Sequence, residues 1–100
     1  MSECCVTLLV PPAFKERLLD TLLMTSQVAL FTSAPAAAHG LDHRRMSTSE
    51  QVLGLTVMTQ VQILLALADR DAVLARLGEQ CAGSGMRYWV TPVLDAGEFA

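Results

Sequence analysis

Both histidines of this 100-residue chain fall in one short polar segment, residues 39–45, which reads HGLDHRR. His39 and His43 stand four residues apart, with Asp42 between them. Neutral imidazole is a common ligand of zinc, copper and nickel, and a stable site for such an ion needs three or four ligands. We therefore consider a transition-metal site made by His39, Asp42 and His43, completed by a cysteine or by another subunit. The alternative is that both histidines are solvated loop residues, because an H-x3-H pattern alone has low specificity.

The same segment carries positive charge. Arg44 and Arg45 would repel a bare cation and fit docking to an acidic partner better. Together with Glu50, they are the candidate partner-binding residues of a loop over about 39–54. The chain has a net charge of −3 and no longer basic run than these two arginines, which argues against a nucleic-acid partner.

A glycine-rich turn is the second candidate site. Gly83, Ser84 and Gly85 would present backbone N–H groups to an anion, with Arg87 close behind them. If Met86 and Arg87 lie in a strand, however, their side chains point to opposite faces. The alternative is that the two glycines only end a helix and form a turn.

The cysteines and the rest of the sequence do not indicate catalysis. Cys4, Cys5 and Cys81 lack zinc-ribbon spacing, so we expect reduced thiols in a cytoplasmic protein. Cys4 and Cys5 should point to opposite faces of one strand, and Cys81 should lie in the core. The sequence has no nucleophile and base at a recognisable spacing, no P-loop and no dinucleotide fingerprint, so we expect no enzyme.

Composition predicts one domain over residues 1–100 with more apolar surface than one core needs. Hydrophobic residues make up 52% and charged residues 17% of the chain. The most apolar stretch, residues 52–68, is interrupted by Gln60 and Gln62 and is too short and polar to span a membrane. The N-terminal residues lack a cationic leader, so we expect a chain that is neither exported nor membrane-embedded.

The first half of the chain reads as strand, helix, strand. Residues 4–10 place Cys4, Val6, Leu8 and Val10 on one face and Cys5, Thr7 and Leu9 on the other, which suits a strand buried on both sides. Pro11 and Pro12 end that strand and favour a helix start. The helix should run to about Met24, with an apolar stripe made of Phe14, Leu18, Leu19, Leu22 and Leu23. Residues 28–33 form a second strand, and residues 34–40 either extend it or form a loop. Pro35 favours an edge strand or an irregular arm.

The second half repeats the pattern in the order strand, helix, strand. Period-two alternation predicts a long strand over residues 55–68, and Asp69 is a good N-cap for the helix that follows. Val73, Leu74, Leu77 and Cys81 form its stripe, Gly83 stops it, and residues 86–94 form a strand with Pro92 at an edge or bulge. The order βαββαβ predicts an α+β, ferredoxin-like fold with a four-stranded antiparallel sheet and two helices on one face.

Since the helices can cover only one face of the sheet, the apolar residues on the other face should meet another copy of the chain. The aromatic residues of the last strand fit this arrangement. Tyr88 and Trp89 alternate, so one should pack beneath the helices and the other on the second face.

Four stretches resemble a known family. They are TLLVPP at 7–12, FTSAPAAAHG at 31–40, SEQVLG at 49–54 and GSGMRYWVTPVLDAG at 83–97. In this order they resemble the PII-like superfamily, which includes nitrogen-regulatory PII and CutA-type proteins. The resemblance is to a branch often encoded beside heavy-metal efflux systems of the RND type.

The resemblance implies a homotrimer whose sheets face inward, a flexible signalling loop over about 39–54, and ligand clefts between subunits. In PII proteins the glycine-rich turn cradles phosphates, and those that bind adenine nucleotides carry a lysine directly after the second glycine. Met86 stands at that position here, which argues against nucleotide binding.

The first functional hypothesis is therefore a trimeric PII-like regulatory or sensor protein. Its loop would contact a partner, a metal-efflux component or its regulator, in metal homeostasis. The second hypothesis is a metal-binding protein that holds zinc, copper or nickel at His39 and His43, with Asp42. The third is a structural oligomer without a small ligand.

Overall fold

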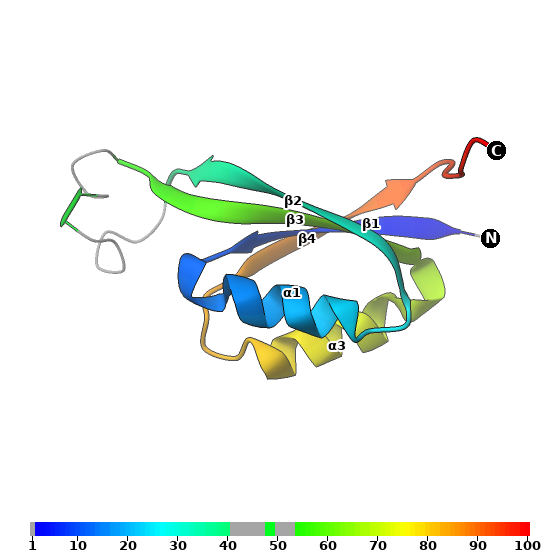
Figure 1. The fold of residues 1–100 in the computed structure, drawn as a ribbon, viewed down its shortest axis with the longest axis horizontal. Helices are drawn as coiled ribbons and strands as arrows, with labels where there is room; N and C mark the ends of the chain where they lie inside the picture. Colours follow the sequence, from blue (N-terminus) through cyan, green and yellow to red (C-terminus); the bar gives the residue numbers. More distant parts are fainter. Residues whose placement is uncertain (1, 41–47, 50–53) are drawn as a thin grey trace.

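The computed structural model describes residues 2–40, 48–49 and 54–100. The elements run in the order β1 (Glu3–Val10), a 3-10 turn (Pro12–Phe14), α1 (Lys15–Leu23), β2 (Val28–Ala38), β3 (Thr56–Ala66), a second 3-10 turn (Leu67–Asp69), α3 (Arg70–Gln80) and β4 (Arg87–Val93). The strands form one antiparallel sheet in the order β2-β3-β1-β4, and both helices lie against the same face of it (Figure 1). The predicted ferredoxin-like fold is confirmed.

The core lies between the sheet and the two helices. β1 is a central strand, and its side chains at alternate positions are almost completely buried against the helices. β3 contributes the same alternation, and the apolar stripes of α1 and α3 close the layer from the other side. The buried cluster comprises Cys4, Val6, Leu8, Val10, Leu18, Leu22, Val61, Ile63, Leu65, Val73, Leu77 and Cys81.

The stripe predicted for α1 is correct except at its last member. Leu18 and Leu22 are buried, and Phe14 and Leu19 pack against the core, but Leu23 is 72% exposed. α1 ends at Leu23, and the chain then turns toward β2, so this position no longer faces the sheet.

The edge positions of the two proline-containing strands are confirmed. β2 and β4 are the outer strands of the sheet, where Pro35 and Pro92 need not donate a ladder hydrogen bond. β2 continues beyond the predicted residue 33 to Ala38 because β3 pairs with it along this whole length, up to the pair Ala38–Thr56. A register shift between Val28 and Leu30 marks a bulge at its start.

The end of β3 differs from the prediction, whereas Asp69 is the N-cap residue of α3 as predicted. The strand ends at Ala66, the last residue paired with β1, and Leu67–Asp69 form a 3-10 turn whose Leu67 N–H donates to the Ser2 carbonyl at 3.0 Å. Asp69 precedes α3, but its carboxylate makes no capping hydrogen bond, since its backbone is already helical at φ −93° and ψ −5°. The 3-10 turn therefore leads directly into the helix.

Gly83 ends α3 as predicted. Its φ is +76°, a conformation that side chains with a Cβ rarely adopt, and the Ser84 N–H behind it donates to the Cys81 carbonyl at 3.2 Å. The helix is therefore stopped by a turn whose backbone favours glycine.

The second face of the sheet carries no helix in the described part of the chain and mixes polar with apolar residues. The pairing registers place Leu30, Leu64, Cys5 and Thr91 in one row across it, and Thr32, Gln62, Thr7 and Trp89 in the next. Leu30 is 60% and Trp89 45% exposed. Tyr88 alternates with Trp89 as predicted and lies in the row of buried Leu8, but it is 57% exposed and so does not pack beneath the helices as predicted.

Removing a buried side chain between α1 and the sheet should destabilise the fold strongly. Leu18→Ala should lower the free energy of unfolding by about 2–5 kcal/mol, because Leu18 is fully buried and its loss leaves a cavity. Leu67→Ala, at a position that is 44% exposed, should cost about 1 kcal/mol or less. Urea denaturation at one fixed protein concentration measures both, and equal losses would contradict this assignment of the core.

The two glycines at the end of α3 should respond to alanine with opposite signs. Gly83→Ala should lower the free energy of unfolding by about 1–2 kcal/mol, because alanine is strained at positive φ. Gly78 lies within the helix, and a Cβ there meets no atom within 4 Å, so Gly78→Ala should raise stability by about 1 kcal/mol. Thermal denaturation of the two variants side by side is the measurement. Stabilisation by Gly83→Ala would refute the strained turn.

Candidate functional site

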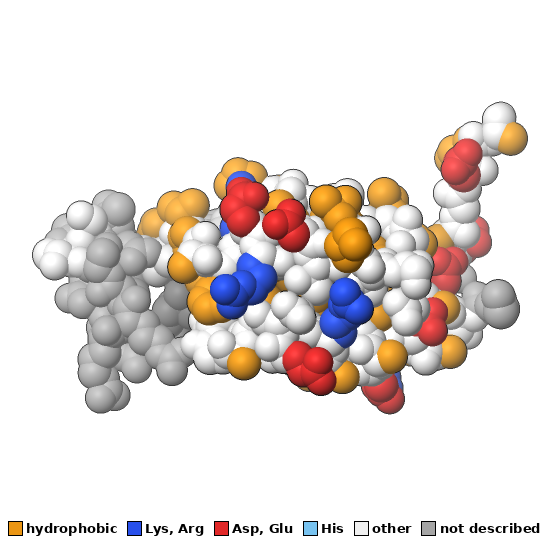
Figure 2. All heavy atoms as spheres, turned by 60° about the horizontal axis from the view of Figure 1, so that its bottom comes forward, with side chains coloured by type: hydrophobic (Ala, Val, Ile, Leu, Met, Phe, Trp, Pro, Cys, Tyr) orange, Lys and Arg blue, Asp and Glu red, His pale blue; other side chains and the backbone are white. Residues whose placement is uncertain are grey.

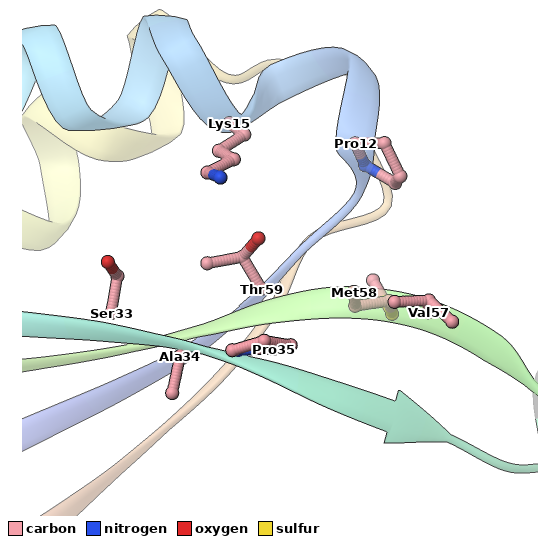
Figure 3. Close-up of a pocket in the computed structure, with 8 residues that line it drawn as sticks. All are labelled: Pro12, Lys15, Ser33, Ala34, Pro35, Val57, Met58 and Thr59. Atoms are coloured by element: carbon pink, nitrogen blue, oxygen red, sulfur yellow. The ribbon is translucent and has the colours of Figure 1, made fainter.

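A pocket of about 330 Å³ lies between the start of α1 and the paired strands β2 and β3 (Figure 3). Three of its residues carry hydrogen-bonding side chains, and the others are apolar. Its lining comprises Pro12, Lys15, Ser33, Ala34, Pro35, Val57, Met58 and Thr59.

Local structure directs the three polar side chains toward the same space. The 3-10 turn at Pro12–Phe14 places Lys15 as the first residue of α1, and its side chain extends toward the sheet (Figure 3). Ser33 pairs with buried Val61, and Thr59 pairs with buried Val10, so both hydroxyls lie on the helix-covered face. One ammonium and two hydroxyl groups therefore converge from three different elements.

The charge of this pocket suits an anion. Lys15 forms no ion pair with another described residue, and it stands at the N-terminal end of α1, where the helix dipole adds partial positive charge. Glu16, the acidic residue of that first turn, does not line the pocket. The ammonium and the hydroxyls can all donate hydrogen bonds to a carboxylate, phosphate or carbonate group.

Sequence analysis missed this pocket. Lys15 stands on the polar side of an amphipathic helix, and Ser33 and Thr59 look like ordinary strand residues. One signal was available, since Lys15 is the only lysine in the chain and stands three residues after Pro12, at the start of the helical region.

In the glycine-rich turn at Gly83, Ser84 and Gly85, some N–H groups already donate hydrogen bonds to nearby residues of the chain. The Ser84 N–H donates to the Cys81 carbonyl, and the Met86 N–H donates to Ser84 Oγ at 3.1 Å. Among the described residues, the N–H groups of Gly83 and Gly85 meet no acceptor. Arg87 is exposed and pairs with Leu9, on the helix-free face of the sheet. An anion site at this turn stays a prediction, and the structure brings Arg87 to the opposite face from Met86.

His39 is the one member of the predicted metal site that the structure describes. It is exposed directly after β2, and its Nδ1 lies 3.2 Å from the Gly54 carbonyl oxygen. Asp42, His43, Arg44, Arg45 and Glu50 lie outside the described residues. Within residues 2–40, 48–49 and 54–100, no three histidine, cysteine, aspartate or glutamate side chains gather closely enough to hold a metal ion.

The three thiols lie where the strand and helix patterns predicted. Cys4 and Cys81 are buried in the core, and Cys5 is half-buried on the other face. Burial raises the pKa of both Cys4 and Cys81, against the smaller opposing effects of Arg70 on Cys4 and Arg17 on Cys81. These two thiols therefore stay protonated at neutral pH, which makes them poor nucleophiles.

Neither helix in the described part of the chain is long and apolar enough to cross a bilayer.

Several solved structures share this fold at low sequence identity. A DUF3240 family protein from Shewanella baltica matches with a TM-score of 0.83 and 19% identity, covering 100% of this chain and 99% of the other. The periplasmic divalent cation tolerance protein CutA from Archaeoglobus fulgidus matches with a TM-score of 0.73 and 9% identity, covering 96% and 88%. CPII, a nitrogen regulatory PII-like protein from Thiomonas intermedia bound to ADP, AMP and bicarbonate, matches with a TM-score of 0.71 and 12% identity, covering 99% and 98%.

These likenesses confirm the resemblance to PII-like and CutA-type proteins at the level of fold. No curated protein sequence matches the chain significantly. A family model described as "Protein of unknown function (DUF3240)" matches residues 1–100, and the chain therefore belongs to the DUF3240 family.

Proposed function

We propose that this chain is a PII-like regulatory protein that assembles as a trimer and senses a small anion. The ligand would bind in the pocket formed by Lys15, Ser33 and Thr59, and the segment 39–54 would act as the signalling loop. The observation that carries this proposal is that the pocket is built on the two strands that lead into and out of that segment.

The pairing of these strands supplies the coupling. Pro35 pairs with Thr59 inside the pocket wall, and Ala38 pairs with Thr56 at the start of the segment, so only a few residues separate ligand from loop. An anion held by Lys15 from α1 and by hydroxyls from β2 and β3 would fix the helix start against both strand ends. Such a ligand shifts the loop from one conformation to another to the extent that it binds the second conformation more tightly than the first.

The size and chemistry of the pocket favour a small anion over a whole nucleotide. A volume of about 330 Å³ is near the lower end for ligand sites, roughly 300–1,000 Å³. Met86 also stands where nucleotide-binding PII proteins carry a lysine. Of the three ligands bound to the similar CPII protein, bicarbonate fits this pocket better than ADP or AMP.

The proposed regulatory role also includes an assembly of three copies and a partner protein. Three copies would cover the helix-free faces of one another's sheets, and the single domain would work in the cytoplasm without catalysis. The partner at Arg44, Arg45 and Glu50 would be a metal-efflux component or its regulator, which rests on the family resemblance alone.

Removing the pocket's charge should weaken anion binding. Lys15→Gln should weaken the binding of bicarbonate or phosphate by about tenfold to a hundredfold, because a hydrogen bond to a charged group contributes roughly 1.5–3 kcal/mol. Thr59→Val should weaken it less, since it removes one neutral donor. Isothermal titration calorimetry with bicarbonate, phosphate, AMP and ADP measures these affinities.

Arg76→Gln is the matched control for that titration. It removes one positive charge from an exposed position on α3 and should leave the affinity unchanged. No heat with any of the four ligands, or equal affinity in wild type and Lys15→Gln, would refute the anion pocket.

The second candidate function is a metal site at His39, which one contact favours. A neutral ring that donates from Nδ1 to the Gly54 carbonyl leaves Nε2 with a lone pair available to a metal ion. His43 and Asp42 would supply further ligands.

Titration with Zn²⁺, Cu²⁺ and Ni²⁺ tests that site. His39→Ala should weaken metal binding at least tenfold, and His39→Ala/His43→Ala should abolish it, because a single imidazole holds such ions poorly. The circular dichroism spectra of both variants should match wild type. Unchanged metal binding in the double variant would show that these histidines are not metal ligands. If neither the metal ions nor the anions give heat on titration, the third hypothesis remains, a structural oligomer without a small ligand.

A further inference from the structure

Residues 94–100, which follow β4, extend away from the body of the molecule (Figures 1 and 2). Leu94 is 101% and Phe99 103% exposed, so both large apolar side chains make almost no contact with their own chain. Asp95 and Glu98 are exposed beside them. Packing this segment against a partner would remove both apolar side chains from water, which is favourable.

An uncharged hollow with several apolar side chains lies at the opposite edge of the sheet. It has a volume of about 400 Å³ and lies between the end of α1 and the start of β2. Leu23 is 72% and Leu30 60% exposed there, and the whole lining comprises Leu22, Leu23, Thr25, Val28, Ala29, Leu30 and Phe31.

The register of the sheet brings the segment and the hollow to the same end of the molecule. Val93, the last residue of β4, pairs with Glu3, which pairs with Ala66. The neighbouring Leu65 pairs with Val28, the first residue of β2. The segment therefore leaves one edge of the sheet at the end where the hollow opens on the other edge, with β1 and β3 between them.

A closed ring of identical copies joins one patch of each copy to a different patch of the next, and the two edges of this sheet, β2 and β4, are two such patches. In a ring closed through these edges, the end of β4 in one copy would lie beside the start of β2 in its neighbour. We infer that residues 94–100 of one subunit occupy the hollow of the next subunit, with Leu94 and Phe99 in contact with Leu23 and Leu30. This inference rests on the ring assembly of the proposed function and names the contact that closes it.

Photo-cross-linking from position 99 tests the contact directly. Phe99 is replaced by p-benzoylphenylalanine in the full chain, and isotope-labelled and unlabelled chains are mixed before irradiation. Cross-linked dimers and trimers should form, and their joined peptides should pair position 99 of one isotope with residues 22–31 of the other. The same photoreactive residue at Glu79, exposed on α3, should give no cross-link to residues 22–31.

Light scattering on Phe99→Asp and Leu30→Asp provides the second readout. In both variants the protein concentration needed for the trimer to form should rise at least tenfold, because each substitution would put a carboxylate in the apolar contact. A wild-type trimer that cross-links only within one chain, or away from residues 22–31, would overturn this contact and leave the trimer standing. A monomeric wild-type chain would overturn both.

Discussion

Two helices cover one face of a four-stranded sheet, and in the described chain the other face has no helix over it. On β1, Val6 and Leu8 are fully buried under the helices, whereas on the second face Cys5 and Leu9 are half-buried and only Thr7 between them is buried, at 4% exposed. That second face mixes Leu30 and Trp89 with glutamines and threonines. Such a surface suits contact with another folded copy, where polar groups find partners and apolar groups leave water.

The same sheet links the candidate site to the signalling segment. β2 and β3 carry Ser33 and Thr59 into the anion pocket and then extend, as a paired ribbon, to the residues where the segment begins and ends. A paired ribbon transmits displacement because its backbone hydrogen bonds hold both strands together. In the proposed function, the ligand, the loop and the subunit contact all involve one edge of the sheet, since the hollow beside Leu30 lies on β2 as well.

Local pattern predicted the elements that are decided locally. The strand around Val6 and the helix stop at Gly83 needed no tertiary information, and both predictions are confirmed. The errors arise where a partner decides the outcome. β2 is longer than predicted because β3 pairs with it, and β3 is shorter because its pairing with β1 ends at Ala66. Lys15 was missed because its closeness to Ser33 and Thr59 exists only after the helix packs on the sheet.

The account depends most on copies of the chain covering one another's open sheet faces. Sedimentation equilibrium of the wild-type protein at micromolar concentration measures this directly. We expect a single species of three times the 10.8 kDa chain mass. A folded species of 10.8 kDa that persists as the concentration is raised would contradict the account, because the open face would then be stable in water without a partner.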